Sequence, residues 1–459
     1  MDYQRILDNV PDYKAFMSVD EMDQSTLKLK EEYPDLIDLT IIGHSRNDHP
    51  IYCMKIGHGE KKALMFGCPH PNEPMGAMML EYFSRALCED DEFRENCGYT
   101  WYLIKCIDID GTKLNEGWFK GPFNLTNYAR NFFRPTSYEQ VEWTFPIQYK
   151  QLKFDRPMPE TKALMKLIDE VKPDFMYSLH NAGFGGAYWY ITEDLPELWD
   201  QFYHAAQSRG MPLSLGEPEA PYITAFAPAI FKNTGIQEDY DYVEKYADKD
   251  SDLSKRFECG TSSNDYASKY GTVSLVGELP YFYSPKIESD KIMPFTRKEA
   301  LIKGEQIKLN EYDEIAEGYQ LYQKYVSDDN PFAKMVEMMI KNRKASYEES
   351  VRHVEADDKF NEPCKESEAF DSLDITRFYA LLIWGLLVRG AKFECTRHEG
   401  DVAQQLKKTA EMLEKKMMVK ARAVESIEYS LVPIQTLVRI QLESGLIVSS
   451  YIKEKGIER

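Results

Sequence analysis

The sequence lacks the features that mark secreted, membrane-bound or nucleic-acid-binding proteins. Its first residues, MDYQRILDNVPDY, have no basic start, no apolar core and no small-residue cleavage site, so we expect no signal peptide. Positive charge is scarce, because 56 Lys and Arg stand against 76 Asp and Glu and give a formal charge of −20. Such an excess of acid argues against nucleic acid or an anionic membrane as partner. We therefore expect a soluble, cytoplasmic protein.

Long apolar runs and paired cysteines are also missing. The longest apolar run, residues 378–388, is well short of the roughly 20 residues that span a bilayer, so it predicts a buried helix. None of the eight cysteines forms a C-x-x-C pair, and Cys53, Cys68 and Cys106 lie inside strand-like runs. We expect reduced, buried thiols, with disulfides or a Cys-based metal site as the alternatives.

What the sequence does contain is enough apolar material for more than one folded unit. With 459 residues and 43% hydrophobic residues, it fits two or three domains. Up to about residue 300, short apolar runs bounded by Gly, Pro and Asn alternate with helix-like segments, which predicts an α/β domain with a mixed, mostly parallel sheet over residues 1–305. The strand-like runs are residues 35–45, 50–57, 61–68, 99–111, 173–181 and 271–280, and the helical ones 75–87, 157–171 and 195–210.

The character of the chain changes after this point. Strand-like runs become scarce, and long helix-compatible stretches appear at residues 297–326 and 401–432. We therefore predict a helical accessory domain over residues 306–459. It could cover a cleft, bind a partner or mediate oligomerisation, or its acidic faces could simply be solvated. The oligomeric state stays open.

Reactive side chains follow three of the predicted strands. His70 and Glu73 come just after the run KKALMFGC, His180 ends DFMYSLH, and Glu278 ends TVSLVGE. In open α/β sheets, ligands bind in the crevice at the carboxyl ends of the strands. We therefore expect these four residues to lie close together.

Their types suit a catalytic zinc ion. Two imidazoles and one carboxylate leave a fourth position open for water, whose pKa falls toward neutrality on the metal. A further carboxylate is then needed as the base, and Glu278 fits this role. Each residue has a structural alternative: a His-x-x-Glu spacing arises by chance, a histidine at a strand end is often a hydrogen-bonded structural group, and Glu278 could cap a turn. The conjunction of all four favours zinc.

The order of several motifs resembles the zinc metallocarboxypeptidases (carboxypeptidase A-like) across roughly residues 10–290, as a divergent bacterial-type member with a C-terminal helical extension. The opening YPDLIDLTIIGHSRNDHPIYCMKIG is similar to the family's opening segment. The later motifs are His70-Pro71-Asn72-Glu73, Asp108-Ile109-Asp110-Gly111, Ala129-Arg130-Asn131-Phe132, Ser178-Leu179-His180, and the stretch from Cys259 to Tyr266 that leads into Glu278-Leu279.

The resemblance implies a fold, a cofactor and residue roles. The fold is an eight-stranded mixed sheet flanked by helices, and the cofactor is one Zn²⁺ per chain on His70, Glu73 and His180. Glu278 becomes the general base and then the proton donor to the leaving amine. Arg130 matches the arginine that grips a substrate carboxylate, which a planar guanidinium can bind through two hydrogen bonds. The resemblance also implies a small peptide or peptide-like substrate.

The chain departs from the family pattern around the substrate. Ala129 replaces an asparagine of the carboxylate clamp, and Asn127, Asn131 and Arg134 are the candidates to take its place. Asn72 replaces an arginine, as in branches that cut γ-D-glutamyl bonds in bacterial cell-wall peptides. We include Asn72 and Asn131 among the predicted substrate-binding residues.

Three further positions lack a clear match. The oxyanion-binding arginine has none, and Lys120 is our candidate for the cation that stabilises the tetrahedral oxyanion, with a solvated surface lysine as the alternative. The mobile active-site tyrosine falls near Phe257, so Tyr240 or Tyr242 would have to supply the hydroxyl. The position that sets side-chain specificity falls on Asn264, which speaks against a purely apolar pocket.

Three functions compete on these grounds. The first is a zinc metallopeptidase that hydrolyses a peptide or isopeptide bond. The second is a zinc amidase or deacylase acting on N-acyl amino acids, although such relatives are usually shorter. The third is a non-catalytic binding protein on a degenerate peptidase scaffold, which the departures at Ala129 and Phe257 motivate and the intact ligands and base oppose.

Overall fold

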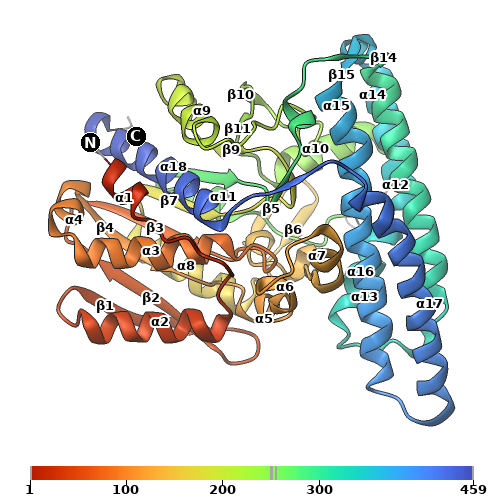
Figure 1. Ribbon diagram of the computed structural model, residues 1–459, viewed down its shortest axis with the longest axis horizontal. Helices are drawn as coiled ribbons and strands as arrows, with labels where there is room; N and C mark the ends of the chain where they lie inside the picture. Colours follow the sequence, from red (N-terminus) through yellow and green to blue (C-terminus); the bar gives the residue numbers. More distant parts are fainter. Residues whose placement is uncertain (1–2, 249–251, 254–255, 457–459) are drawn as a thin grey trace.

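The centre of the protein is a nine-stranded mixed sheet, seen in a computed structural model that describes residues 3–248, 252–253 and 256–456 (Figure 1). The sheet holds all six predicted strand runs. It has nine strands where the resemblance implied eight, and two short strands form a hairpin at one edge. The order across the sheet is β1 (Ile37–His44), β2 (Pro50–Ile56), β4 (Tyr99–Ile104), β3 (Lys61–Gly67), β7 (Phe175–Leu179), β12 (Val273–Glu278), β9 (Tyr188–Ile191), β11 (Ile230–Lys232) and β10 (Ala225–Ala227).

The central strands run parallel and are buried on both faces. β4, β3, β7 and β12 pair in parallel, while β1, β2 and β9 join antiparallel. Along β3, Ala63 and Met65 enter one core and Leu64 and Phe66 the other, as the alternation of a strand requires. This burial on both sides explains why the strands read as continuous apolar runs in the sequence.

Helices cover both faces of the sheet. The larger core lies under α3 (Met75–Glu89), α9 (Trp199–Gln207) and α18 (Ile434–Lys455), and the smaller one under α8 (Pro159–Val171) and α11 (Ser263–Ser268). A capping box of Ser18 and Glu21 starts α2 (Val19–Glu32). The remaining elements of this part are α1 (Gln4–Asp8), α4 (Asp91–Cys97), α5 (Ile109–Lys113), α6 (Glu116–Phe119), α7 (Leu125–Asn131), α10 (Ile236–Tyr246), β5 (Ile147–Tyr149), β6 (Leu152–Phe154), β8 (Phe184–Gly185), β13 (Phe282–Tyr283) and β14 (Ile292–Thr296).

The predicted helical region is present, and it forms an upright bundle beside the sheet (Figure 1). The apolar run at residues 378–388 is the buried middle of its central helix, as predicted. Among the helices of the described ranges, none combines the length and apolarity needed to cross a bilayer. The bundle elements are α12 (Arg297–Gln320), α13 (Pro331–Lys341), α14 (Arg343–Ala356), β15 (Pro363–Lys365), α15 (Glu366–Phe370), a π-helical turn (Asp371–Ile375), α16 (Thr376–Cys395) and α17 (Gly400–Glu425).

The last helix leaves the bundle and returns to the sheet. After β16 (Ser430–Leu431), α18 packs on α3, α9 and β7, beside the N-terminal helix (Figure 1). Ser444 accepts a hydrogen bond from Trp189 of the sheet at 3.0 Å, and the backbone of Ser449 accepts one from Tyr99 at 2.9 Å. The bundle is therefore an insertion between β14 and α18, and the boundary predicted at residue 305 separates α18 from the core to which it belongs.

The cysteines are all free, and seven of the eight are buried. Burial raises the pKa of the Cys53 thiol to about 12. These thiols pack as small apolar side chains.

Candidate functional site

Three parallel strands deliver the predicted residues to one edge of the sheet. Gly67 of β3 lies opposite Leu179 of β7, so His70 and His180 both follow these neighbouring strand ends. Ser178 lies opposite Val276 of β12, two residues before Glu278. The carboxyl ends of parallel strands thus bring the residues together, as the sequence predicted.

His70, Glu73 and His180 form a buried cluster that could hold a metal ion. One ligand atom from each lies within 4.8 Å of the others, and it is the only such group of His, Cys, Asp and Glu among the described residues. His180 Nδ1 is 3.2 Å from Glu73 Oε2. Donor atoms about 2.0–2.2 Å from a tetrahedral zinc lie roughly 3.3 Å from one another, so this spacing fits zinc.

The hydrogen bonding of the imidazoles also fits a metal. The Ser178 hydroxyl donates to Glu142 at 2.6 Å, so its oxygen accepts from His180 Nε2 at 2.8 Å and leaves Nδ1 facing the cluster. His70 Nδ1 is buried and has no hydrogen-bond partner among the described residues. A buried ring nitrogen without a partner is costly unless a ligand satisfies it.

The charges around the cluster shift the pKa values of both histidines. Burial, followed by the positive charge of Arg134, lowers the pKa of His70 well below its ordinary value, so its ring is neutral. Burial alone would lower the pKa of His180, but the nearby carboxylates of Glu142 and Glu73, 3.6 and 3.2 Å away, outweigh burial and raise the pKa to about 10. A metal cation would displace that proton, because metal ligands bind deprotonated.

Glu278 lies beside this cluster at the end of β12. Its Oε1 is 3.7 Å from His180 Nδ1, and the residue is buried. Burial, followed by the negative charge of Glu73, raises the pKa of Glu278 well above its ordinary value. A carboxyl group in this environment is a stronger base than one in water.

Arg134 is the cation that the structure brings to the cluster. Its Nη1 is 3.4 Å from Glu73 Oε1, and its side chain lines a cleft of about 540 Å³. Gln140 and Trp143 also line this cleft, together with residues of α12, α13 and α14 of the inserted bundle. The bundle therefore shares a cleft with the arginine that contacts Glu73.

Lys120 and Arg130 make their contacts elsewhere. The Lys120 ammonium binds Glu21 at 2.6 Å and the carbonyl of Phe16 at 2.9 Å, because it lies beside the start of α2. Arg130 points outward from α7 and pairs with Glu414 of the bundle at 3.2 Å. These ion pairs give no support to the oxyanion role predicted for Lys120 or to the carboxylate grip predicted for Arg130.

Asn131 and Ala129 are covered by the bundle as well. The Asn131 side chain donates to the backbone carbonyl of Asn127 at 3.0 Å, and the backbone carbonyl of Asn131 accepts from Arg389 of α16 at 2.7 Å. A Cβ at Gly385 of α16 would lie 1.9 Å from the Ala129 carbonyl oxygen. The helix therefore packs directly on the backbone of the segment in which the resemblance placed the carboxylate clamp.

Asn72 and Asn264 stay near the cluster. Asn72 donates to the Tyr128 hydroxyl at 3.1 Å, and Asn264 follows Ser263, whose hydroxyl donates to Glu142 at 2.8 Å. The Oδ1 atoms of both asparagines are buried and have no hydrogen-bond partner within the described ranges. Both can accept a hydrogen bond from a ligand.

The tyrosines considered as replacements for Phe257 differ in position. Tyr240 is fully buried and packs on Phe257 with ring centroids 5.1 Å apart. Tyr242 lines the cleft, and its hydroxyl has no partner among the described residues.

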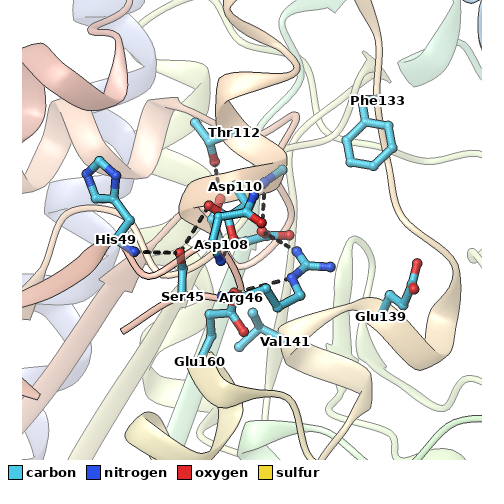
Figure 2. A network of polar contacts seen from close by, with 12 residues as sticks. Ser45, Arg46, His49, Asp108, Asp110, Thr112, Phe133, Glu139, Val141 and Glu160 are labelled. Carbon is cyan, nitrogen blue, oxygen red and sulfur yellow. Dashed lines mark hydrogen bonds and ion pairs between the residues drawn. The ribbon is translucent and has the colours of Figure 1, made fainter. Parts of the chain in front are cut away.

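A network of charged side chains surrounds Asp108 and Arg46 (Figure 2). The Asp108 carboxylate accepts a hydrogen bond from the Arg46 guanidinium at 3.1 Å and caps α5 by accepting one from the Gly111 backbone N–H at 3.0 Å. The Asp108 backbone N–H donates to the Cys68 carbonyl at 3.2 Å. Arg46 also binds Glu160 at the start of α8 at 3.3 Å. The turn Asp108–Gly111 therefore fixes the strand end that precedes His70.

Sequence reasoning missed Glu142 altogether. It lies in the segment EQVEWTFP, far from any predicted strand end, and matches no recognised motif. Its only local signal is a carboxylate between the apolar residues Val141 and Trp143. Burial opposes its charge, but the nearby His180 ring and the hydrogen bond from Ser178 hold the pKa of Glu142 below its ordinary value.

Comparisons with known proteins place this geometry in context. A family model described as zinc carboxypeptidase matches residues 22–267, a little over half of the chain. No curated protein matches the chain. Similar solved structures include carboxypeptidase A from Helicoverpa armigera, at 14% identity and a TM-score of 0.37, covering 58% of this chain and 65% of that one.

Two bacterial structures are also similar. The metallo-carboxypeptidase from Burkholderia cenocepacia has 15% identity and a TM-score of 0.32, covering 57% of this chain and 60% of that one. The murein-tripeptide amidase MpaA from Escherichia coli O157 has 15% identity and a TM-score of 0.28, and the match covers 58% of this chain and 89% of that one. The chain thus spans less than two thirds of the length of the two carboxypeptidases.

Proposed function

Because this chain belongs to the zinc carboxypeptidase family, we propose that it is a zinc-dependent peptidase that hydrolyses a peptide or isopeptide bond. The observation that carries the proposal is the buried cluster of His70, Glu73 and His180 with Glu278 beside it. Two imidazoles and one carboxylate make up the ligand set of a catalytic zinc site, which keeps one position open.

Glu278 is the proposed base. When bound to the cluster, zinc supplies Lewis acidity and brings the pKa of water toward neutrality. Glu278 then takes a proton from the attacking water and passes it to the leaving nitrogen. Its burial supports this role, because a desolvated carboxylate is more basic.

Arg134 is the proposed cation for the developing oxyanion. Its Nη1 lies 3.4 Å from Glu73 Oε1, and its side chain lines the cleft that the bundle borders. A fixed guanidinium in a water-poor site stabilises negative charge on the carbonyl oxygen as it forms. We assign to Arg134 the oxyanion-stabilising role predicted for Lys120. Asn72 and Asn264 remain proposed hydrogen-bond acceptors for the substrate.

The test compares the wild-type protein with Glu278→Gln. Both are loaded with zinc and assayed on peptides with a free C-terminus, on γ-D-glutamyl muropeptides and on N-acyl amino acids. We expect the wild type to cleave a peptide class and Glu278→Gln to lose about 10³-fold or more in kcat, since a positioned base contributes on that order. Zinc content, measured by plasma mass spectrometry, should stay at one per chain.

The matched control is Glu197→Gln, an exposed glutamate that bonds the Tyr451 hydroxyl and should behave like the wild type. A zinc-loaded protein that cleaves nothing in the panel would contradict the proposal, as would full activity in Glu278→Gln. Release of free acid from N-acyl amino acids without peptide cleavage would favour the amidase alternative.

A further inference from the structure

The cleft that Arg134 lines is bounded by two parts of the chain that lie far apart in the sequence. Arg134 and Tyr242 line it from the sheet domain, whereas Tyr312, Met338 and Ser346 line it from α12, α13 and α14 of the inserted bundle (Figure 1). A ligand in this cleft therefore has to fit between the sheet domain and the bundle.

A buried ion pair joins the two sides of the cleft. The Arg256 guanidinium donates to both carboxylate oxygens of Glu349 in α14, at 2.7 and 2.9 Å. Both residues line the cleft, and their side chains are only 16% and 5% exposed. Such a pair is costly to separate, because each partner would be left as an uncompensated buried charge. The pair therefore fixes α14 to the sheet domain.

Two further contacts bring the two sides together. The backbone N–H of Ser137 donates to the Met338 thioether of α13 at 3.5 Å, and both residues line the cleft. At the end of α10, the carbonyl of Tyr246 accepts from Arg352 of α14 at 2.7 Å, and the Tyr246 ring packs on His353 with centroids 5.0 Å apart. The sheet domain and the bundle thus meet at three places around the cleft.

The bundle side of the cleft is part of the protein core and not a flap. α13 buries Phe332, Ala333 and Val336 in the large hydrophobic core. α14 is tied to α12 by Arg343, which binds Asp313 at 2.6 Å. Close-packed interiors are nearly incompressible, so helices held in this way keep their distance from the sheet domain. That distance limits the size of a ligand.

The volume of the cleft, about 540 Å³, suits a small ligand. Pockets of roughly 300–1,000 Å³ enclose most of the surface of a drug-sized molecule, which for a peptide means a few residues. A longer chain would have to push the two sides apart and separate Arg256 from Glu349. The same holds for the terminus of a folded protein.

We propose that the site acts on short peptides of a few residues and excludes long chains and the termini of folded proteins, because α13 and α14 bound the cleft. The inference rests on the proposed function, since Arg134 is the residue that places the reacting carbonyl group at this cleft. Glu349 becomes a specificity-determining residue. It sets the accepted length by holding α14 against the sheet domain.

The experiment measures how peptide length affects turnover. A short peptide that the zinc-loaded wild type cleaves is extended stepwise at its N-terminus to twelve residues, so that the C-terminal residues stay the same. We expect kcat/KM to fall at least about tenfold along this series, because discrimination against a longer chain comes from the cost of forcing it into the cleft. The same peptide fused to the end of a folded carrier protein should stay uncut.

Two variants change the cleft in opposite directions. Glu349→Gln removes the charge that holds α14, so the ratio of kcat/KM between the shortest and longest peptides should fall toward one. Ser346→Trp narrows the cleft and should lower the longest accepted length. Glu348→Gln is the matched control, because Glu348 is the neighbouring residue of α14 and is exposed. It should keep the wild-type length profile.

A second readout does not depend on turnover: calorimetric binding of the same peptides to zinc-loaded Glu278→Gln, with and without Glu349→Gln. Equal values for short and long peptides in the wild-type cleft overturn the size limit, and so does a length profile that neither Glu349→Gln nor Ser346→Trp changes. If short peptides bind with the expected length limit but none is cleaved, the proposed function fails and the size limit stands. If no peptide is bound or cleaved, both fail.

Discussion

Glu142 shows how a residue far from the recognised motifs sets the chemistry of another. Its carboxylate accepts hydrogen bonds from the Ser178 hydroxyl at 2.6 Å and from the Ser263 backbone N–H at 3.0 Å. Because Ser178 in turn contacts the His180 ring, Glu142 sets the orientation of that ring through Ser178. Partners of this kind fix the tautomer and orientation of a histidine that binds a metal.

We expect Glu142→Ala to weaken zinc binding. Without this carboxylate the His180 ring loses its fixed orientation, and loss of such a partner typically costs about 10- to 100-fold in metal affinity. Competition with a fluorescent chelator measures the effect. Glu139→Ala is the control, because Glu139 lies three residues away and pairs with Lys334 of the bundle at 3.1 Å. Unchanged zinc affinity in Glu142→Ala would show that Ser178 alone orients the ring.

At the level of elements, the last helix behaves as part of the sheet domain. α18 buries one face against α3, α9 and the sheet, and Gly445 allows close approach, because a Cβ there would lie 3.1 Å from the Tyr177 ring. Gln441 of the same helix donates to the backbone carbonyl of His180 at 3.2 Å. The helix therefore supports the strand end that carries a candidate metal ligand.

Leu446→Ala in α18 should destabilise the whole protein. Leu446 is 1% exposed within the large core, and removal of a buried leucine side chain typically costs about 2–5 kcal/mol. The urea midpoint of unfolding, followed by circular dichroism, measures this loss. Val419→Ala in α17 is the control, because Val419 is 63% exposed and should change stability by less than about 0.5 kcal/mol. Equal midpoints for the two variants would contradict the packing role of α18.

At the level of the whole molecule, one core joins both parts of the chain. The larger hydrophobic cluster includes Met65 of the sheet, Trp384 of α16 and Leu442 of α18. α16 also packs on α7, where Arg389 binds the carbonyls of Leu114, Asn131 and Phe132 at 2.7–2.8 Å. The bundle is thus a wall of the cleft as well as an insertion.

A chain that ends at residue 305 should fail to fold cooperatively. It would lack α18 and expose the apolar face of the sheet that this helix covers. We expect an insoluble product or one that binds the dye ANS and unfolds without a sharp transition. A chain that ends at residue 456 keeps all of α18 and serves as the control. A soluble, zinc-binding fragment of residues 1–305 with a sharp unfolding transition would contradict this expectation.

Local pattern was sufficient for much of the fold. Strands buried on both faces, such as residues 61–67, appear in the sequence as apolar runs. Reactive residues at the ends of parallel strands meet at one edge of the sheet, so the sequence was enough to group His70, Glu73, His180 and Glu278. The contacts of Lys120 and Arg130 could not be predicted, because the sequence around a charged residue in a loop or on a short helix does not indicate the direction of its side chain.

Periodicity and strand ends were enough to predict six of the nine strands of the sheet, the helical character of the C-terminal region and the grouping of the candidate metal ligands. Other features became visible only in the folded protein: α18 returns to the sheet, Glu142 orients His180 through Ser178, and α16 packs on the segment around Ala129. Those features depend on contacts between residues as many as 350 positions apart, which no local pattern records.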